Sequence, residues 1–390
     1  MIQRFLIVFA IVVIAAAARS ETGVTDKEIL IGSCAPLQQD LGKQEMGGAR
    51  AYIEYINQEQ GGVNGRKIRL LSLDDKFNTE GATECFNQLV KENVFAGAFF
   101  AGTAPTLQHA KMAMASHVPA IGMMSGANYL YQPFKRYVIN VRATLADEMI
   151  YILEHLHKEL GLTKIGVLYW EDMLGLDGLD GVKRFLDKHQ LPMTGEASLL
   201  RVSAAEKTQE EVNAAIEKLR AAKPEVVVLA INYKHQVMAL KRAQEIGWKP
   251  QFVLLAARDS IIKHAGDASE GAVWSIVFPH ISRLDLPTVA LHEKLMKKYQ
   301  PSVELDIKTL EGFIHAVLLV EGLKRAGRKL TREKLIDAYE AMKGVDIGLG
   351  PKFTLSFSPT NHQGFNAIDT VVVVRDGKSV PVTDWKALKK

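Results

Sequence analysis

The stretch "ILIGSCAPLQQDLGKQEMGGARAYIEYINQEQGGVNGRKIRLLSLDD", residues 29–75, sets a pattern that recurs along the chain. It opens with a short apolar run that predicts a buried strand at residues 28–35. Apolar residues then recur at spacings of three and four, which predicts one face of a helix: Met46, Ala49, Ile53 and Ile56. Gly-Gly at 61–62 ends this helix, Asn-Gly at 64–65 turns the chain, and residues 67–75 form the next strand.

This alternation of strand and helix continues through most of the sequence. Short runs rich in Val, Ile and Leu predict further strands at residues 95–101, 120–125, 164–170, 225–231 and 251–256. Strands of this kind are buried on both faces, because helices cover both sides of a parallel sheet. The fold class is therefore α/β, in two similar series, the second of which begins after residues 137–144.

The C-terminal part departs from this rhythm. Helices are expected at residues 287–299 and 308–326. Residues 352–359 and 367–382 are expected to form antiparallel strands, the latter with an Asp-Gly turn at 376–377. No low-complexity linker separates the two series, which indicates two lobes joined by several close strands.

Residues 1–20 have the pattern of a secretory signal peptide. Arg4 precedes an uncharged apolar run at residues 5–18, and small residues lie at its end: Ala16, Ala18 and Ser20. The run is too short to span a bilayer comfortably. We therefore expect cleavage near Ala18 or Ser20 and export to the periplasm, with an N-terminal membrane anchor as the alternative.

Length, charge and composition indicate the number of domains and argue against a nucleic-acid partner. The chain has 390 residues, a formal charge of +4 and only 7% aromatic residues, and no dense Lys/Arg block appears, so no nucleic-acid partner is expected. This length suits two domains of ordinary size.

The two cysteines are Cys34, at a strand end, and Cys85, within a helix. Export permits a disulfide, but we expect two separate buried thiols.

The sequence lacks the motifs of catalysis and metal binding. "GMMSG" at residues 122–126 has the spacing G-x-x-S-G and not that of a nucleophile elbow. "GLDGLDG" at 175–181 lacks the G-x-G start of a dinucleotide loop, and the eleven histidines show no zinc spacing. The carboxylate pairs at 74–75 and 171–172 point in different directions on a strand. We expect no catalytic residue, metal or cofactor.

Loops that follow strands are the best candidates for a binding site, because ligands in open α/β sheets lie beyond the carboxyl ends of the strands. Three such loops carry small or polar residues: 101–106, 123–128 and 170–175. In "AGTAPT", Gly102 allows close backbone approach, Thr103 can cap a helix and Pro105 suits its first turn. This helix start has no lysine, and its free amides predict a binding site for a carboxylate, with an ordinary capped helix as the alternative.

Over residues 24–385 the sequence resembles the periplasmic solute-binding proteins of ABC importers, of the branched-chain amino acid (leucine/isoleucine/valine) binding type. Beside the opening stretch, "GTAPTLQHAKMAMASHVPAIGMMSGA", "YVINVRATLADE" and "LEGFIHAVLLVEGLKRAG" carry the resemblance. None of these is a catalytic signature, so the resemblance rests on the order and spacing of strands, loops and helices.

The resemblance implies a type I periplasmic binding protein fold of two lobes with a three-strand hinge. The N-terminal lobe would comprise residues 24–143 and 279–348, and the C-terminal lobe residues 144–278 and 349–390. The crossovers would lie near residues 141–146, 273–279 and 348–353. Ligand binding would close the lobes around a cleft, and a membrane-embedded ABC permease would recognise the closed form of the monomer.

It also implies site residues. In members that bind amino acids, backbone amides and a hydroxyl of the first lobe hold the carboxylate, at positions matching Gly102, Thr103, Met123 and Ser125. The opposing side would add Asp147 after the first crossover, and Leu174, Asn232 and Tyr233, with Leu41 as the first-lobe counterpart of Leu174. Beyond the resemblance, we expect Arg258 on the opposing side, and Leu41 and Phe313 against the apolar part of the ligand.

The sequence departs from the family in one respect. An acidic residue beyond "QFVLL" normally pairs with the ligand's ammonium, but here Ala256 and Ala257 precede Arg258 and Asp259. An unpaired buried ammonium would be costly, so we expect an apolar or aromatic carboxylic acid. Arg258 is either a second anion contact or a surface residue, and an amino acid-like ligand stays open because Asp259 can swing in.

The expected function is that of an extracytoplasmic receptor that delivers a small carboxylate-bearing ligand to an ABC permease. The first alternative is a periplasmic ligand-sensing subunit of a signalling system. An enzyme on the same α/β scaffold is the second alternative.

Overall fold

The computed structural model of the protein describes residues 21–200 and 205–388. The expected signal peptide at residues 1–20 lies outside these residues. Within them, no helix combines the length and the apolar character needed to cross a bilayer.

The N-terminal lobe contains a five-stranded sheet of order β2-β1-β3-β4-β5, in which all neighbours are parallel. Its strands are β1 (Glu28–Ala35), β2 (Lys67–Asp74), β3 (Ala96–Ala101), β4 (Ala120–Met124) and β5 (Val138–Ile139). Every residue of β3 and of β4 is buried, as expected for central strands covered by helices on both faces.

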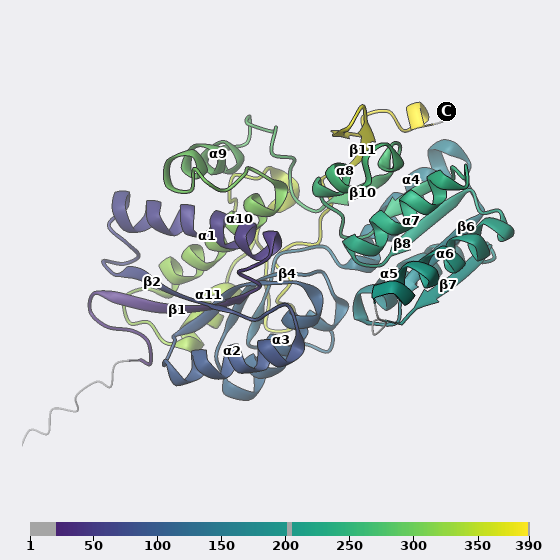
Figure 1. The fold of residues 1–390 in the computed structure, drawn as a ribbon. Coiled ribbons are helices and arrows are strands. Elements are labelled where there is room, and N and C mark those ends of the chain that lie inside the picture. The colour runs from purple at the N-terminus through teal and green to yellow at the C-terminus, as the bar shows by residue number, and fades with distance from the viewer. Residues whose placement is uncertain (1–20, 201–204, 389–390) are drawn as a thin grey trace, which may run out of the picture.

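The helices around this sheet come from both ends of the sequence. The first group is α1 (Asp40–Glu59), α2 (Thr79–Lys91) and α3 (Thr103–Ser116); the second is α9 (Pro287–Tyr299), α10 (Ile307–Ala326) and α11 (Arg332–Glu340). Figure 1 shows α9 and α10 beside α1, although more than 200 residues separate them in the chain. A Cβ on Gly48 would lie 1.9 Å from the carbonyl oxygen of Thr309. Glycine therefore permits the close approach of α1 to α10.

The C-terminal lobe contains a seven-stranded sheet of order β12-β11-β10-β9-β8-β6-β7. Its strands are β6 (Ile165–Trp170), β7 (Gly195–Leu199), β8 (Val226–Ala230), β9 (Gln251–Leu254), β10 (Val273–Ile276), β11 (Thr370–Arg375) and β12 (Lys378–Pro381). The strands from β6 to β10 pair in parallel, whereas β11 pairs antiparallel with both β10 and β12. The Asp-Gly hairpin predicted at residues 376–377 thus joins β11 to β12.

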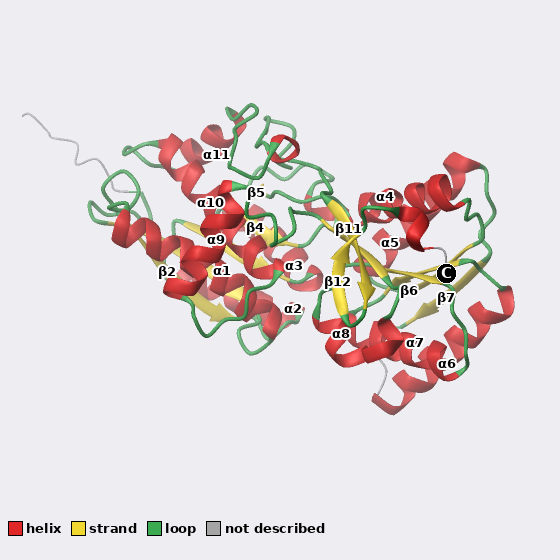
Figure 2. Cartoon of the chain, turned by 90° about the horizontal axis from the view of Figure 1, so that it is seen from above, coloured by secondary structure: helices red, strands yellow, loops and turns green. Residues whose placement is uncertain are grey.

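Helices surround the second sheet as they do the first (Figure 2). They are α4 (Leu145–Leu160), α5 (Met173–His189), α6 (Ala205–Ala222), α7 (Tyr233–Glu245) and α8 (Ser260–Ala265). Short 3-10 turns lie at η1 (Asn128–Leu130), η2 (Gly266–Ser269), η3 (Pro351–Phe353) and η4 (Trp385–Leu388). Two mostly parallel sheets flanked by helices confirm the α/β fold class and the type I arrangement of the two lobes.

The strand predicted at residues 352–359 is wrong. Its first residues belong to η3, and the remainder forms only isolated bridges, Val345 with Leu355 and Ser358 with Asn361. The apolar residues that suggested a strand are Phe353, Leu355 and Phe357, all buried. They pack inward from an irregular segment, and the prolines at positions 351 and 359 limit any longer ladder.

The segment after the expected third crossover, residues 348–353, contacts the N-terminal lobe. Val345 and Leu355 exchange backbone hydrogen bonds, and the amide of Gly364 donates to the carbonyl of Asn140 at 2.8 Å. The amide of Asp369 donates to Ile276, in the second sheet, at 3.1 Å. We therefore propose that this crossover lies at residues 364–369; the division into lobes stays a prediction.

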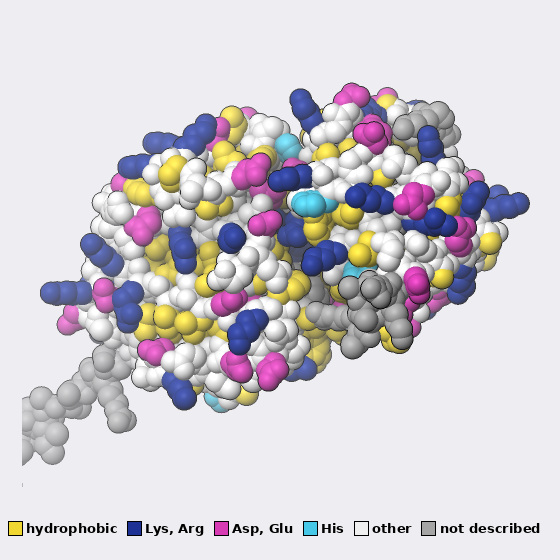
Figure 3. All heavy atoms as spheres, viewed as in Figure 1, with side chains coloured by type: hydrophobic (Ala, Val, Ile, Leu, Met, Phe, Trp, Pro, Cys, Tyr) yellow, Lys and Arg dark blue, Asp and Glu magenta, His cyan; other side chains and the backbone are white. Residues whose placement is uncertain are grey.

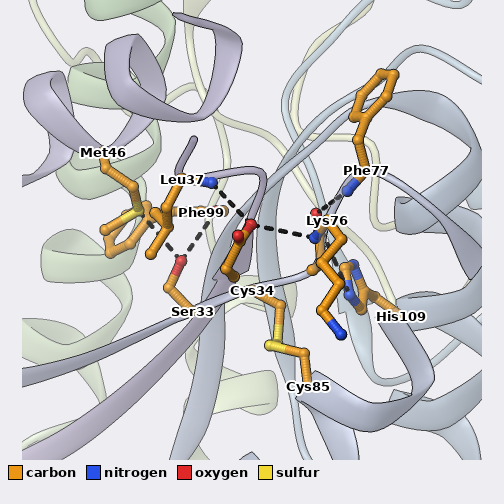
Figure 4. Close-up of a disulfide and its surroundings, with 11 residues drawn as sticks. Ser33, Cys34, Leu37, Met46, Lys76, Phe77, Cys85, Phe99 and His109 are labelled. Carbon is orange, nitrogen blue, oxygen red and sulfur yellow. Dashed lines mark hydrogen bonds and ion pairs between the residues drawn. A yellow bond between two sulfur atoms is a disulfide. The ribbon is translucent and has the colours of Figure 1, made fainter. Parts of the chain in front are cut away.

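Cys34 and Cys85 form a disulfide, which corrects the expectation of two free thiols. Their Cα atoms are 6.0 Å apart, and the side chains are 0% and 5% exposed. Figure 4 shows the bond between the end of β1 and helix α2. The two cysteines are 51 residues apart in the chain, and only the packing of α2 against β1 brings them within bonding distance.

Candidate functional site

A cavity of about 660 Å³ lies where the two lobes meet. The N-terminal lobe lines it with residues 38–41, Phe77, residues 102–103, residues 124–126 and Lys308. The C-terminal lobe contributes Leu174, residues 231–234, Leu255, Ala256, Arg258 and His264. In Figure 3, basic and histidine side chains gather along the junction between the halves.

Helix α3 begins at the wall of the cavity without a side-chain cap. Its N-cap is Gly102, with φ of 89°, and not Thr103 as the sequence suggested. A Cβ on Gly102 would lie 2.2 Å from the ring of Phe77, so both the backbone conformation and the packing favour glycine. No described residue accepts from the amides of Thr103 and Ala104. Free amides at a helix start suit an anion.

Two hydroxyl groups lie beside this helix start. The Ser125 hydroxyl donates to the Thr103 hydroxyl at 3.1 Å and accepts from the amide of Ala127 at 3.3 Å. The side-chain amide of Asn140 donates to the carbonyl of Ser125 at 3.2 Å and so fixes the backbone at the end of β4. Ser125 is therefore held in position next to the amides of α3.

The opposite wall comes from loops that follow β8 and β9. Asn232 caps α7 by accepting from the amide of His235 at 3.1 Å. The guanidinium of Arg258 lies over the ring of Tyr233, 4.5 Å from its centroid. The Tyr233 hydroxyl in turn hydrogen-bonds to Nδ1 of His264. These contacts fix an aromatic ring and a cation on the side that faces α3.

The charged lining of the cavity is predominantly basic. Lysine and arginine side chains come from both lobes and from the first crossover: Arg142, Lys234, Arg258 and Lys308. Among the described residues, Asp40 is the one acidic side chain in the lining, and it is exposed. Such a field attracts an anion and disfavours a cation.

Arg142 and Lys308 belong to a buried ion-pair cluster that joins the lobes. Arg142 Nη2 lies 3.2 Å from Glu148, Arg142 Nη1 pairs with Glu311, and Lys308 Nζ lies 3.1 Å from Glu311. Ser275 donates to Glu148 at 2.6 Å. Burial acts to raise the pKa of Glu311, but the charges of Arg142 and Lys308 outweigh it and lower that pKa to about 2. The Glu311 carboxylate therefore stays ionised, whereas burial raises the pKa of Glu148 against the charge of Arg142.

Seven of the ten predicted site residues lie around the cavity: Leu41, Gly102, Thr103, Ser125, Leu174, Tyr233 and Arg258. Asn232, also expected from the resemblance, lines it as well. Three predicted residues, Met123, Asp147 and Phe313, lie elsewhere. Contact of any of these residues with a ligand remains a prediction.

Each of these three residues makes other contacts, away from the cavity. The Met123 amide donates to the side chain of Asn140 at 2.9 Å, so it cannot serve a ligand. Asp147 accepts from Asn366 at 2.8 Å and lies 3.7 Å from Arg184. Phe313 is fully buried between α1, α9 and α10, with its ring centroid 4.9 Å from that of Tyr52.

Sequence reasoning missed Phe77, Arg142, His264 and Lys308, which all line the cavity. A signal existed for Arg142, because it lies in the first crossover, within the "YVINVRATLADE" stretch. Lys308 gave no such signal, since helix α10 reaches the site through tertiary packing on α1, β3 and β4.

Comparisons with known proteins agree with this architecture. The periplasmic binding protein family matches residues 29–378. A substrate-binding periplasmic protein from Ralstonia solanacearum is similar, with 28% identity, a TM-score of 0.80 and coverage of 90% of this chain and 99% of its own. A fatty acid ABC transporter substrate-binding protein from Thermomonospora curvata has 23% identity, a TM-score of 0.81 and coverage of 93% of each chain.

A branched chain amino acid ABC transporter protein from Thermus thermophilus, solved with bound valine, has 19% identity and a TM-score of 0.78. The similarity covers 93% of this chain and 97% of that one. A search of curated proteins gave no match. Because the family match spans most of the sequence, including both sheets and the residues around the cavity, the chain belongs to the periplasmic binding protein family.

Proposed function

We propose that this protein binds a small carboxylic acid without an α-amino group in the periplasm and delivers it unchanged to an ABC permease. The observation that carries this proposal is the uncapped start of α3, with the Thr103 and Ser125 hydroxyls beside it, in a cavity with a basic lining. Amides, hydroxyls and surrounding cations together provide the donors and the field that a carboxylate requires.

The lining offers little to an ammonium group. The positions beyond β9, where the family places an acid, are occupied by Ala256 and Ala257. Asp259 does not line the cavity, and Asp40 is exposed at the first-lobe wall. An α-amino acid would therefore bring its positive charge among Arg142, Arg258 and Lys308, and among the described residues the cavity lining has no buried carboxylate to pair with it.

Two of the similar proteins support a carboxylate in general terms. One is a fatty acid binding protein, and the other holds valine. Both ligands carry a carboxylate, and the fatty acid lacks an α-amino group. The proposal favours the fatty acid type of recognition because the neutral alanines and the basic lining match it better.

A thermal-shift screen with matched pairs tests this function. 4-Methylpentanoate is compared with leucine, and 3-methylbutanoate with valine, so that each pair differs only in the α-amino group. Benzoate and octanoate extend the panel. We expect the melting temperature to rise with acids that lack the amino group. Selective stabilisation by leucine or valine would overturn the proposal. Mass spectrometry of the released ligand tests delivery without turnover, since a modified ligand would indicate an enzyme.

A further inference from the structure

Arg258 is a cation in the cavity wall that has no ion-pair partner among the described residues. Its Nε is also buried without a hydrogen-bond partner among them. Its guanidinium rests on the ring of Tyr233, 4.5 Å from the centroid, and it lines the cavity. Stacking fixes the plane of the guanidinium and leaves its edge free for two parallel hydrogen bonds to a carboxylate.

A second cation approaches from the other lobe. Lys308 lies in the first turn of α10 and lines the same cavity, with its Nζ 3.1 Å from Glu311. The N-cap of α10 is Asp306, whose pKa is raised by burial, while the charges of Lys308 and Arg258 act in the opposite direction. Arg258 therefore lies within electrostatic range of this helix start, across the junction of the lobes. Asp259 also acts on Asp306, but it does not line the cavity.

Arg142 adds a free donor between these cations and the start of α3. Its Nη atoms pair with Glu148 and Glu311, but its Nε has no hydrogen-bond partner, although the side chain is only 4% exposed. The Nε lies next to Gly126, 3.3 Å from where a Cβ would be. A buried donor without a partner is costly unless a ligand supplies the acceptor.

The cavity thus has two sets of anion donors. The first consists of the α3 amides with Thr103 and Ser125, and the second of Arg258 from one lobe and Lys308 from the other. We propose that the natural ligand is a dianion, a dicarboxylic acid whose second carboxylate binds Arg258 opposite the start of α10. This inference rests on the proposed function, because it assigns the substrate class within the same site.

Charge balance explains why a dianion would be preferred. Glu148 and Glu311 pair with Arg142 and Lys308, whereas Arg258 forms no ion pair among the described residues, although Asp306 lies within its electrostatic range. Closing the lobes on a monocarboxylate would bury the charge of Arg258 without an ion-pair partner, whereas a second carboxylate would neutralise it. The second carboxylate would also contact both lobes, and a ligand favours the closed form only through contacts that the open form lacks.

The test measures calorimetric affinities for pairs of acids that differ in the second carboxylate: hexanoate and hexanedioate, octanoate and octanedioate, and benzoate and benzene-1,4-dicarboxylate. We expect the dicarboxylate of the best-fitting length to bind about tenfold to a hundredfold more tightly than its partner. Arg258→Gln should abolish this difference, because it should weaken binding of the dicarboxylate far more than binding of the monocarboxylate, which loses only a more distant positive charge in the lining. Lys263→Gln is the control, since it removes a positive charge from exposed helix α8 outside the cavity lining.

The outcomes separate this inference from the proposed function. If monocarboxylates bind as tightly as dicarboxylates, or if Arg258→Gln weakens both equally, the dianion assignment is wrong and the carboxylate function stands. If no acid of either kind binds while leucine or valine does, the proposed function fails, and the dianion assignment fails with it.

Discussion

The hydroxyl of Ser125 donates to the hydroxyl of Thr103 across 3.1 Å, and this bond joins the end of β4 to the first residue of α3. Parallel strands β3 and β4 bring these two loops together, because residues of the two strands face each other in register, as Ala101 does Met124. The result is a pair of hydroxyls beside helix amides that no side chain caps. In this lobe, the sheet topology rather than any local motif builds the site that we propose for a carboxylate.

Replacing Ser125 with alanine should weaken binding of the acids that stabilise the protein. The change removes one hydrogen bond to a charged group, worth about 1.5–3 kcal/mol, which corresponds to about tenfold or more in affinity. Calorimetric titration below the unfolding transition measures this loss. The melting temperature should also fall modestly, because the buried amide of Ala127 loses its acceptor. Ser116→Ala is the matched control: Ser116 lies at the far end of α3, where its hydroxyl donates to Met112. Equal affinities for wild type and Ser125→Ala would remove Ser125 from the site.

Gly102→Ala should perturb the ligand site more than it perturbs stability. The positive φ of 89° makes any L side chain strained there, at about 1 kcal/mol. The new Cβ would meet the Phe77 ring at 2.2 Å, and this half-buried ring lines the cavity, so it would shift and reshape the lining. Gly161→Ala is the matched control, because Gly161 has φ of 71° but nothing within 4 Å of a Cβ.

We therefore expect Gly102→Ala to lose more unfolding free energy than Gly161→Ala in urea titrations, because Gly102 lies outside the left-handed helical region and its Cβ would meet Phe77. Only Gly102→Ala should also lower the affinity for acids. A Gly102→Ala variant with wild-type affinity would show that Phe77 does not contact the ligand.

Removing the disulfide should destabilise the protein by about 4 kcal/mol, the loop-closure value for a bridge between residues 51 apart. The measurement is urea unfolding of the Cys34→Ala/Cys85→Ala variant against the oxidised protein. Because both sulfurs are nearly inaccessible, the folded wild type should resist reductant until urea opens it. Coincident unfolding curves for variant and oxidised wild type would contradict this prediction.

The sequence predicted the strands better than it predicted which side chains contact each other. Apolar runs predicted most strands of the two sheets, because burial on both faces leaves a local pattern. They did not predict β7, and they gave residues 273–279 only as a crossover, although β10 lies there. The apolar residues around Phe357 led to the wrong prediction of a strand, because an irregular segment that packs inward produces a similar alternation of apolar and polar residues. The pairing of Cys34 with Cys85 was not predictable, because it depends on how α2 packs on β1.

In the candidate site, too, residues set by a local sequence pattern could be predicted, and residues placed by tertiary packing could not. Gly102, Thr103 and Ser125 were predictable because they immediately follow buried strands. Lys308 was not, since it begins a helix that returns to the first lobe after the whole second sheet. Asp147 follows a crossover as expected, but its carboxylate turns to Arg184 and Asn366, which no local pattern indicates.

A buried acid and a buried histidine lie next to the loop that carries Phe77. Nε2 of His109 is 4.0 Å from Asp75 Oδ2, and both side chains are inaccessible to solvent. Burial raises the pKa of Asp75 to about 6, against a hydrogen bond from the amide of Phe77. Burial lowers the pKa of His109 to about 3. Figure 4 shows His109 close to the disulfide on this side of the sheet.

These two shifts have opposite effects on stability between about pH 4 and 6. Asp75 has an ordinary pKa of 3.8, so the folded state binds more protons there and stability falls as pH rises through this window. His109 has an ordinary pKa of 6.5, so the unfolded state binds more protons and stability rises with pH. In the wild type the two contributions largely cancel.

Removing either partner should expose the contribution of the other. In His109→Gln, the unfolding free energy should fall from pH 4 to 6, with a slope approaching about 1.4 kcal/mol per pH unit relative to wild type. In Asp75→Asn it should rise with pH over the same range. Urea unfolding at pH 4, 5 and 6 measures both slopes, with His117→Gln as the control for an exposed histidine at the end of the same helix. Parallel profiles for His109→Gln and the wild type would mean that the His109 ring does not remain neutral in the folded protein.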